Sequence, residues 1–166
     1  MLDIIWNITL LVCAIVFIAF TFVVAYGAPY LPTLSTKVPL ALKMLNLKKG
    51  QTLLELGSGD GRLLRAAASQ GLKAVGYELN PLLVIYSKLI TFKYRKQVRI
   101  IWGNYWKAEW PKTDGIFVFL LQPYMEKLDK KITQSKQKNI SLVSFAFTIN
   151  SKKPVEQKEG LYLYEY

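Results

Sequence analysis

The chain has 166 residues, room for one domain, and carries 22 Lys and Arg residues against 11 Asp and Glu, a formal net charge of +11. It contains no histidine, which excludes histidine-based catalytic triads and histidine metal ligands. Its single cysteine, Cys13, excludes a disulfide framework and a cysteine metal site, so no metal is expected. Any acid–base chemistry must therefore use Glu, Asp, Tyr, Lys or solvent.

The N-terminal stretch is apolar. Asp3 is the one charged residue before Lys37, and residues 4–26 form a run of 23 without a charge. About 20 such residues span a bilayer, so the sequence predicts one transmembrane helix within residues 1–28. The alternative is a cleaved signal peptide, which has a shorter apolar region preceded by Lys or Arg.

The remainder of the chain is strongly basic. From Lys37 onward there are 22 basic and 10 acidic residues, a net charge of +12. Because these lysines follow the apolar run, the positive-inside rule predicts a single-pass membrane protein with its domain on the cytoplasmic side. An anionic membrane surface is an expected partner of this charge. Nucleic acid is not expected as a partner, since no RNA-binding signature is visible.

Short apolar runs then alternate with amphipathic segments, which is typical of an α/β protein with a doubly wound sheet. A connector and leading helix are expected over residues 29–50, and the domain proper over residues 51–166. Strands are predicted at 52–55, 73–78, 98–102, 115–121 and 140–147. A hairpin is predicted at 155–166 with its turn at Gly160, and its last strand alternates Leu161, Leu163 and Glu165 on one face with Tyr162, Tyr164 and Tyr166 on the other. Helices are predicted up to Gly71, after the N-cap Asn80, and after Tyr124 with Met125, Leu128 and Ile132 inward, with a short one near 105–110. The buried face of the helix after Asn80 is predicted to be Leu82, Ile85, Tyr86 and Leu89.

A glycine-rich turn joins the first strand to the first helix of the domain, in the sequence Glu55-Leu56-Gly57-Ser58-Gly59-Asp60-Gly61-Arg62. Glycines allow positive φ and close approach of a ligand, and helix-start N–H groups favour a carboxylate or phosphate. The dinucleotide fingerprint requires Gly-x-Gly-x-x-Gly, but Arg62 occupies its last position. Glu55 would repel a pyrophosphate and suits an ammonium group. We therefore expect S-adenosylmethionine, which carries an amino group, a carboxylate and a sulfonium but no phosphate.

Polar residues also follow the other predicted strands, at the edge where an α/β sheet binds its ligand. Glu78 lies 21 residues after Gly57, the spacing of an acid that binds ribose hydroxyls. Asn104 is expected to take the adenine amino group, with a plain turn residue as the alternative. Asp60 is either a ligand contact or a helix N-cap. The predicted cofactor-binding residues are Glu55, Gly57, Ser58, Gly59, Asp60, Gly61, Glu78 and Asn104.

At these residues the chain resembles the class I, seven-strand methyltransferases, and in particular the small protein-lysine methyltransferases. That group includes archaeal broad-specificity enzymes and mitochondrial enzymes that methylate the ATP synthase c-subunit and the adenine nucleotide carrier. The resemblance lies in residues 55–62, 66–68, 75–81 and 117–121 and in Tyr30-Leu31-Pro32-Thr33. It implies a Rossmann-like sheet, S-adenosylmethionine as cofactor, and a protein substrate with an accessible lysine, including one embedded in a membrane.

Methyl transfer to lysine requires a neutral amine aligned with the methyl–sulfur bond. A desolvated, aromatic-lined channel lowers the pKa of a lysine and attracts cations. Tyr124 is the first candidate for this catalytic wall, followed by Tyr30 and Trp106. The sequence thus predicts a membrane-anchored protein-lysine methyltransferase. The alternatives are a methyltransferase for a lipid head group or small amphiphile, and a catalytically silent membrane module that binds S-adenosylmethionine.

Overall fold

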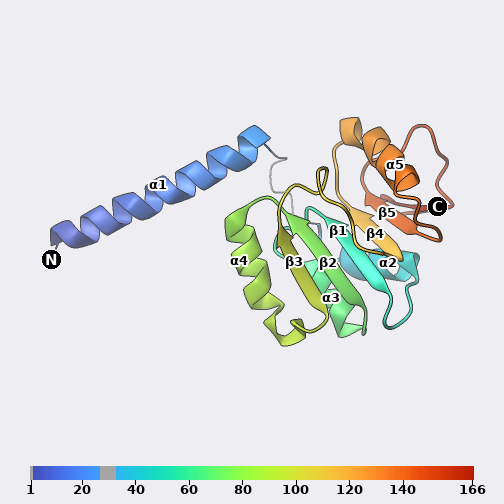
Figure 1. Cartoon of the computed structure of the whole chain (residues 1–166), viewed down its shortest axis with the longest axis horizontal. Helices are drawn as coiled ribbons and strands as arrows, with labels where there is room; N and C mark the ends of the chain where they lie inside the picture. Colours follow the sequence, from blue (N-terminus) through green and yellow to red (C-terminus); the bar gives the residue numbers. More distant parts are fainter. Residues whose placement is uncertain (1, 27–32) are drawn as a thin grey trace.

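A computed structural model describes residues 2–26 and 33–166, including the α1 side chains of residues 2–18 and 21. The N-terminal helix α1 (Leu2–Tyr26) is continuous over 25 residues and precedes the domain (Figure 1). A bilayer crossing needs about 20 apolar residues in a row. Among the residues described, no helix is both long and apolar enough to cross a membrane, so the predicted transmembrane helix is not supported.

The domain is built on one seven-stranded sheet in the order β3-β2-β1-β4-β5-β7-β6. Strands β1 to β5 pair in parallel, whereas β7 runs antiparallel between β5 and β6. The order reverses between β1 and β4, so the switch point lies beside the glycine-rich turn. This confirms the predicted doubly wound α/β fold. The strands are β1 (Thr52–Leu56), β2 (Lys73–Glu78), β3 (Val98–Trp102), β4 (Gly115–Val118), β5 (Ser141–Phe145), β6 (Glu156–Lys158) and β7 (Leu161–Glu165).

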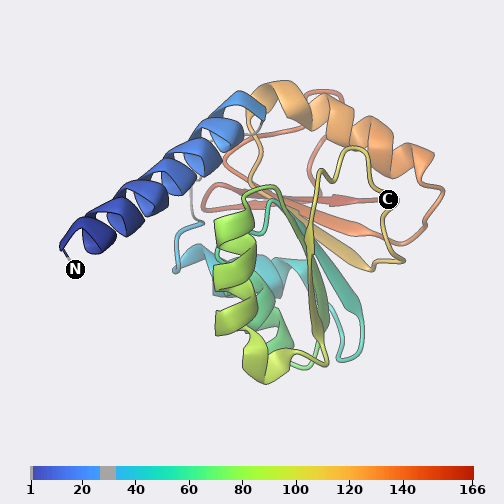
Figure 2. The same cartoon turned by 60° about the vertical axis from the view of Figure 1, so that its left-hand side comes forward.

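Helices cover the two faces of this sheet unequally (Figures 1 and 2). On one face, buried residues of α2 (Lys37–Leu45), α3 (Arg62–Ser69) and α4 (Pro81–Ile90) share an apolar cluster with the sheet. On the other face, α5 (Met125–Gln134) buries the three residues predicted for it, Met125, Leu128 and Ile132. Single 3-10 turns, η1 (Phe92–Tyr94) and η2 (Gln122–Tyr124), follow α4 and precede α5.

The C-terminal hairpin turns at Gly160 as predicted, with φ of 79°. Strand β7 places Leu161 and Leu163 in the cluster beside α2 and α3, and Tyr164 in the cluster beneath α5. The alternation read from the sequence is therefore confirmed, and it explains how one strand can contribute to both layers.

Three predicted elements differ from the structure. Strands β4 and β5 end earlier than predicted, β5 just before Ala146, whose φ is 68°. The segment 105–110 is a turn rather than a helix. Its backbone is held by side-chain hydrogen bonds, since Trp106 N donates to Asn104 Oδ1 (2.9 Å) and Trp110 Nε1 donates to Tyr105 O (2.9 Å). Such local bonds compete with the hydrogen-bond ladder of a helix.

The largest difference concerns α4, whose predicted buried face points to solvent. The helix packs instead through Val84 and Ser87, both buried. A Cβ built on Gly61 would lie 2.9 Å from Ser87 Cβ, so glycine and a small partner are what allow this close approach. The side chains predicted to be buried are exposed by 42–68%: Leu82, Ile85, Tyr86 and Leu89.

Candidate functional site

The glycine-rich turn is held open by its backbone conformation and by β2. Gly57, Gly59 and Gly61 have φ of 84°, 53° and 76°, a region that favours glycine. The N–H groups of Gly57 and Ser58 both donate to Tyr77 O at 2.9 Å. A Cβ built on Gly57 would meet no atom within 4 Å, so this part of the turn faces open space where a ligand can approach.

Glu78 connects this turn to the start of α4. Its carboxylate is 8% exposed and accepts hydrogen bonds from Gly59 N and from Asn80 N, both at 2.8 Å. A carboxylate has about four lone-pair positions, so both oxygens can accept further bonds. Glu78 therefore orders the turn, and its contact with ribose hydroxyls stays a prediction.

Glu55 is buried in β1 with one oxygen, Oε2, that has no hydrogen-bond partner among the described residues. Burial raises the pKa of Glu55 well above its usual value, and the negative charges of Asp60 and Glu78 raise it further. Ser58 Oγ is likewise buried without a partner among the described residues. Native proteins rarely leave such groups unsatisfied. A cationic donor at this place would supply both the missing hydrogen bond and the counter-charge.

Asp60 and Arg62 form an ion pair at the start of α3. Arg62 Nη2 lies 2.7 Å from Asp60 Oδ2, and Arg62 Nε lies 3.0 Å from both carboxylate oxygens. Arg62 Nη1 also donates to Thr33 O at 3.0 Å, which ties the segment before α2 to the turn. Gly61, rather than Asp60, occupies the N-cap position of α3, although Asp60 accepts the N–H of Arg62 (3.1 Å).

Asn104 follows β3 at the same edge of the sheet. Its side-chain oxygen accepts the N–H of Trp106, which is the turn role weighed as the alternative for this residue. Contact with adenine remains a prediction for its amide group.

An aromatic group lies after β3 and β4. The ring of Tyr124, in η2, is 6.2 Å from that of Trp106, which is 4.9 Å from Tyr105. Lys127 Nζ lies 4.4 Å from the centre of the Trp106 ring, so this aromatic face already attracts a cation. Burial raises the pKa of Tyr105, and Tyr124 and the charge of Glu78 raise it further. Tyr30, the other predicted aromatic, lies outside the described residues.

Two site residues were missed from the sequence. Tyr105 was signalled only by its position directly after Asn104. Gly76 was read as an ordinary strand residue, yet a Cβ there would lie 2.5 Å from Leu64 Cδ1 and 2.6 Å from Ser58 Cβ. The absence of a side chain at Gly76 is thus what allows the turn to pack on β2.

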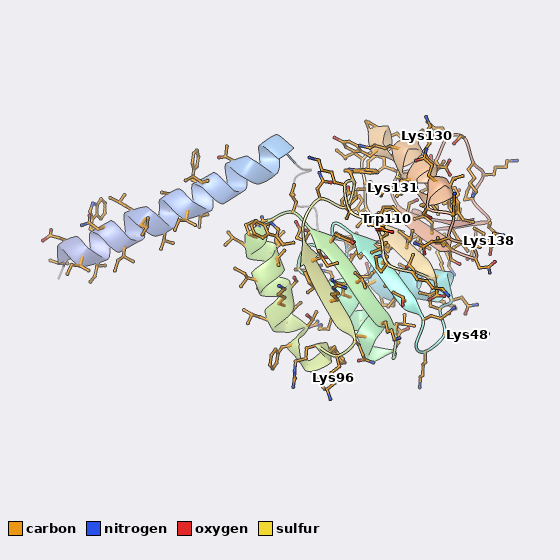
Figure 3. The ribbon with its side chains drawn as sticks, viewed as in Figure 1. Lys48, Lys96, Trp110, Lys130, Lys131 and Lys138 are labelled. Carbon is orange, nitrogen blue, oxygen red and sulfur yellow. The ribbon has the colours of Figure 1, made fainter. Side chains whose placement is uncertain are left out.

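An open polar cleft of about 520 Å³ lies elsewhere, between the 108–112 segment and α5. Trp110 and Lys131, labelled in Figure 3, are among its lining residues. Lys131 is fixed at this cleft: its Nζ donates to Trp106 O and Ala108 O and lies 4.9 Å from the Trp110 ring centre. None of the predicted site residues lines it. The carboxyl edge of β1, β2 and β4 is therefore the candidate site.

Comparisons with known proteins show which family the chain resembles. The chain is 35% identical over 121 residues to the ATP synthase C-subunit lysine N-methyltransferase of Xenopus laevis, with 72% of this chain and 53% of that protein aligned. It therefore spans about half the length of that relative. A protein-lysine N-methyltransferase of Saccharolobus islandicus is 26% identical over 148 residues, covering 82% of this chain and 92% of that protein.

The fold comparison points the same way. The crystal structure of an RNA methyltransferase from Salinibacter ruber, in complex with S-adenosyl-L-homocysteine, superposes with a TM-score of 0.74 and 26% identity. The match covers 81% of this chain and 91% of that one. Residues 55–156, which include Glu55, the glycine-rich turn and Glu78, match the ANTKMT methyltransferase domain. The chain belongs to this methyltransferase domain family.

Proposed function

We propose that this chain binds S-adenosylmethionine and N-methylates lysine in a protein. The observation that carries the proposal is the buried carboxyl oxygen of Glu55, which has no hydrogen-bond partner in the described part of the chain and lies beside an open glycine-rich turn. The ammonium of S-adenosylmethionine would satisfy that oxygen. The proposal is supported by the relatives, whose names include lysine N-methyltransferase, and by the S-adenosyl-L-homocysteine bound in the Salinibacter ruber enzyme.

The residues of the turn fit this cofactor. When bound, S-adenosylmethionine supplies a methyl group activated by a positively charged sulfur. Glu55 would hold the amino end, and Glu78 would accept from the ribose hydroxyls while it keeps Gly59 N–H in place. The open space at Gly57 would let the cofactor approach the backbone of the turn. Both carboxylates are buried, so their attraction for a cation is screened little by water.

The acceptor would enter from the aromatic side. Tyr124 is 43% exposed and stands beside Trp106, so a lysine side chain can pass along their ring faces. Apolar surroundings favour the neutral amine that must attack, and the rings favour the methylated ammonium that forms. Tyr124 is therefore assigned to the acceptor wall rather than to proton transfer.

A second candidate function is RNA methylation. It is favoured by the similarity to the Salinibacter ruber RNA methyltransferase and by the net charge of +11. Lysine methylation is preferred because the Xenopus laevis relative, named as a lysine methyltransferase, is 35% identical to this chain, whereas the RNA methyltransferase is 26% identical.

The test is transfer of a radiolabelled methyl group by the full chain to three acceptors offered separately: a membrane-protein extract, total RNA and lipid vesicles. Label recovered as methyllysine after protein hydrolysis is expected. The variant Glu55→Ala should lose transfer, whereas Glu156→Ala, at an exposed position of β6, should retain it. If the label appeared only in RNA or only in lipid, that molecule rather than protein lysine would be the methyl acceptor. Cofactor binding without any transfer would indicate a silent module.

A further inference from the structure

The outward face of α4 is a continuous apolar surface. Leu82, Ile85, Tyr86 and Leu89 recur with helical spacing, and their exposure ranges from 42% to 68%. Phe92 in η1 (62% exposed) and Trp102 at the end of β3 (63%) extend it. We call these six residues the α4 face. It lies at the β3 edge of the domain, away from the C-terminal hairpin (Figure 1).

This outward placement is fixed by the opposite side of the helix. There the chain carries small residues, and Ser87 and Thr91 satisfy their hydroxyls within the helix, Ser87 Oγ to Val84 O (3.1 Å) and Thr91 Oγ1 to Ser87 O (2.7 Å). The backbone of Gly61 lies so close that a Cβ there would meet Ser87 Cβ at 2.9 Å. Rotating α4 would force a Leu or Tyr side chain into that space. The large apolar residues must therefore stay outside.

Positive charge borders the α4 face at its η1 end. Residues 79–98 contain four basic residues and no acidic one. Lys88 lies on α4 itself, and the guanidinium of Arg95 lies 4.8 Å from the Phe92 ring centre. Figure 3 shows Lys96 at the end of α4 beyond η1. The surface thus has an apolar centre and a basic border. The four basic residues are Lys88, Lys93, Arg95 and Lys96.

We propose that the α4 face seats the domain on an anionic lipid bilayer, with α4 parallel to the membrane plane. The apolar side chains would enter the boundary between head groups and acyl chains, and the basic border would contact anionic head groups. RNA would require the positive charge at the centre of the surface, where this one is apolar. The proposal does not depend on methyl transfer, nor on α1 crossing a membrane.

Binding of the α4 face to the bilayer would also orient the candidate site. Leu82 and Trp102 lie at the carboxyl ends of β2 and β3, the edge that carries Glu78. Trp102 is held there because its Nε1 donates to Leu79 O at 3.0 Å. The glycine-rich turn would therefore open close to the lipid surface.

The test reports insertion at α4 itself, because α1 also carries exposed apolar side chains and can bind lipid in any variant. In the full chain with Cys13→Ser, an environment-sensitive fluorophore is attached at Ile85→Cys or, as control, at Val155→Cys. Val155 is 63% exposed and precedes β6, at the opposite edge of the sheet. With phosphatidylglycerol-containing vesicles we expect a blue shift and quenching by brominated lipid at position 85 and none at 155.

Paired variants test the two components of the surface. With the probe at position 85, Leu89→Ser/Phe92→Ser should weaken insertion into anionic vesicles by about tenfold or more, and Val155→Ser should not. Lys88→Gln/Lys93→Gln should weaken insertion in low salt only, and Lys130→Gln/Lys138→Gln should not. A probe at 85 that stays in water with every vesicle would overturn the proposal. A blue shift at position 85 that depends on protein concentration alone would mean that the α4 face binds a second copy of the chain. A blue shift caused by RNA alone would mean that the face binds RNA. Unchanged methylation of a soluble lysine acceptor by Leu89→Ser/Phe92→Ser would separate loss of membrane insertion from failure of the proposed function.

Discussion

The two halves of the carboxyl edge of the sheet are held very differently. Around β1 and β2, Glu55 and Glu78 are buried, and the glycine-rich turn is fixed to β2 by three hydrogen bonds. After β4, Leu121 and Tyr124 are 37% and 43% exposed, and Tyr124 has aromatic neighbours rather than buried polar partners. The first half is held in place by hydrogen bonds within the chain, whereas the second is exposed to solvent and accessible to an acceptor. Binding of the cofactor and binding of the acceptor should therefore respond to different substitutions.

The largest effect should come from Glu78→Ala. This substitution removes the acceptor of Gly59 N–H and Asn80 N–H together with the proposed ribose contact. Losing a charge-assisted hydrogen bond costs about 1.5–3 kcal/mol, or roughly 10- to 100-fold in affinity for S-adenosylmethionine, to be measured by calorimetry. Glu109→Ala, at an exposed position, is the control. Wild-type affinity in Glu78→Ala would mean that the part of the carboxyl edge around β1 and β2 is not the cofactor site.

Gly76→Ala should test the packing of the glycine-rich turn on β2 without removing a side chain that is proposed to contact the cofactor. The added methyl would lie 2.5 Å from Leu64 Cδ1 and 2.7 Å from Ser58 Oγ, so the turn must move away from β2. Overpacking of this kind lowers the free energy of unfolding by about 1–3 kcal/mol, measurable by urea titration. Gly103→Ala is a matched control, because a Cβ there would meet nothing within 4 Å. Equal stability of the two variants would contradict the close packing of turn on strand.

Glu55→Gln should stabilise the cofactor-free domain while weakening cofactor binding. Because the pKa of Glu55 is raised by burial, the folded state keeps its proton at pH values where the unfolded chain has lost it. Stability therefore falls as pH rises from the unfolded pKa, about 4.3, through the folded pKa, and stays reduced above it. Each unit between the two pKa values is worth about 1.4 kcal/mol.

The gain from Glu55→Gln should thus be full above the folded pKa and vanish below pH 4 to 5, as followed by urea titrations across pH. Glu156→Gln, at an exposed site, should give no such pH-dependent gain. Cofactor binding to the wild type should also release a proton, visible as a buffer-dependent binding enthalpy. A stability gain that did not vary with pH would rule out the raised pKa as its cause.

The smallest effect is expected on the open side. Tyr124→Ala should raise KM for the lysine acceptor about two- to fivefold, since a cation–π contact at an exposed site is worth about 0.5–1 kcal/mol. Tyr124→Phe keeps the ring and should behave like the wild type. Affinity for S-adenosylmethionine should be unchanged in both variants. A large loss of cofactor affinity in Tyr124→Ala would show that the two halves are not independent.

Sequence reasoning succeeded where local patterns decide the structure. The glycines of the turn, the strand-end position of Glu78 and the N-cap Asn80 can each be read from a few neighbouring residues. The alternation of side chains along β7 is an equally local pattern. It failed at α4, because apolar periodicity predicts which side chains share a face but not which way that face points. The direction was decided by the backbone of Gly61, a contact between two helices. Gly76 was missed for the same reason, since its neighbours Leu64 and Ser58 come from other elements.

The contacts that Arg62 makes with Asp60 and Thr33 have a mechanical consequence. It is the first residue of α3, it is paired with Asp60, and it holds the carbonyl of Thr33 at the entrance to the domain. Tension applied to the chain before residue 33 therefore reaches the glycine-rich turn through Arg62. A ligand that stiffens the turn should raise the force at which this entrance segment detaches, so that load on the N-terminal region and occupancy of the site report on each other.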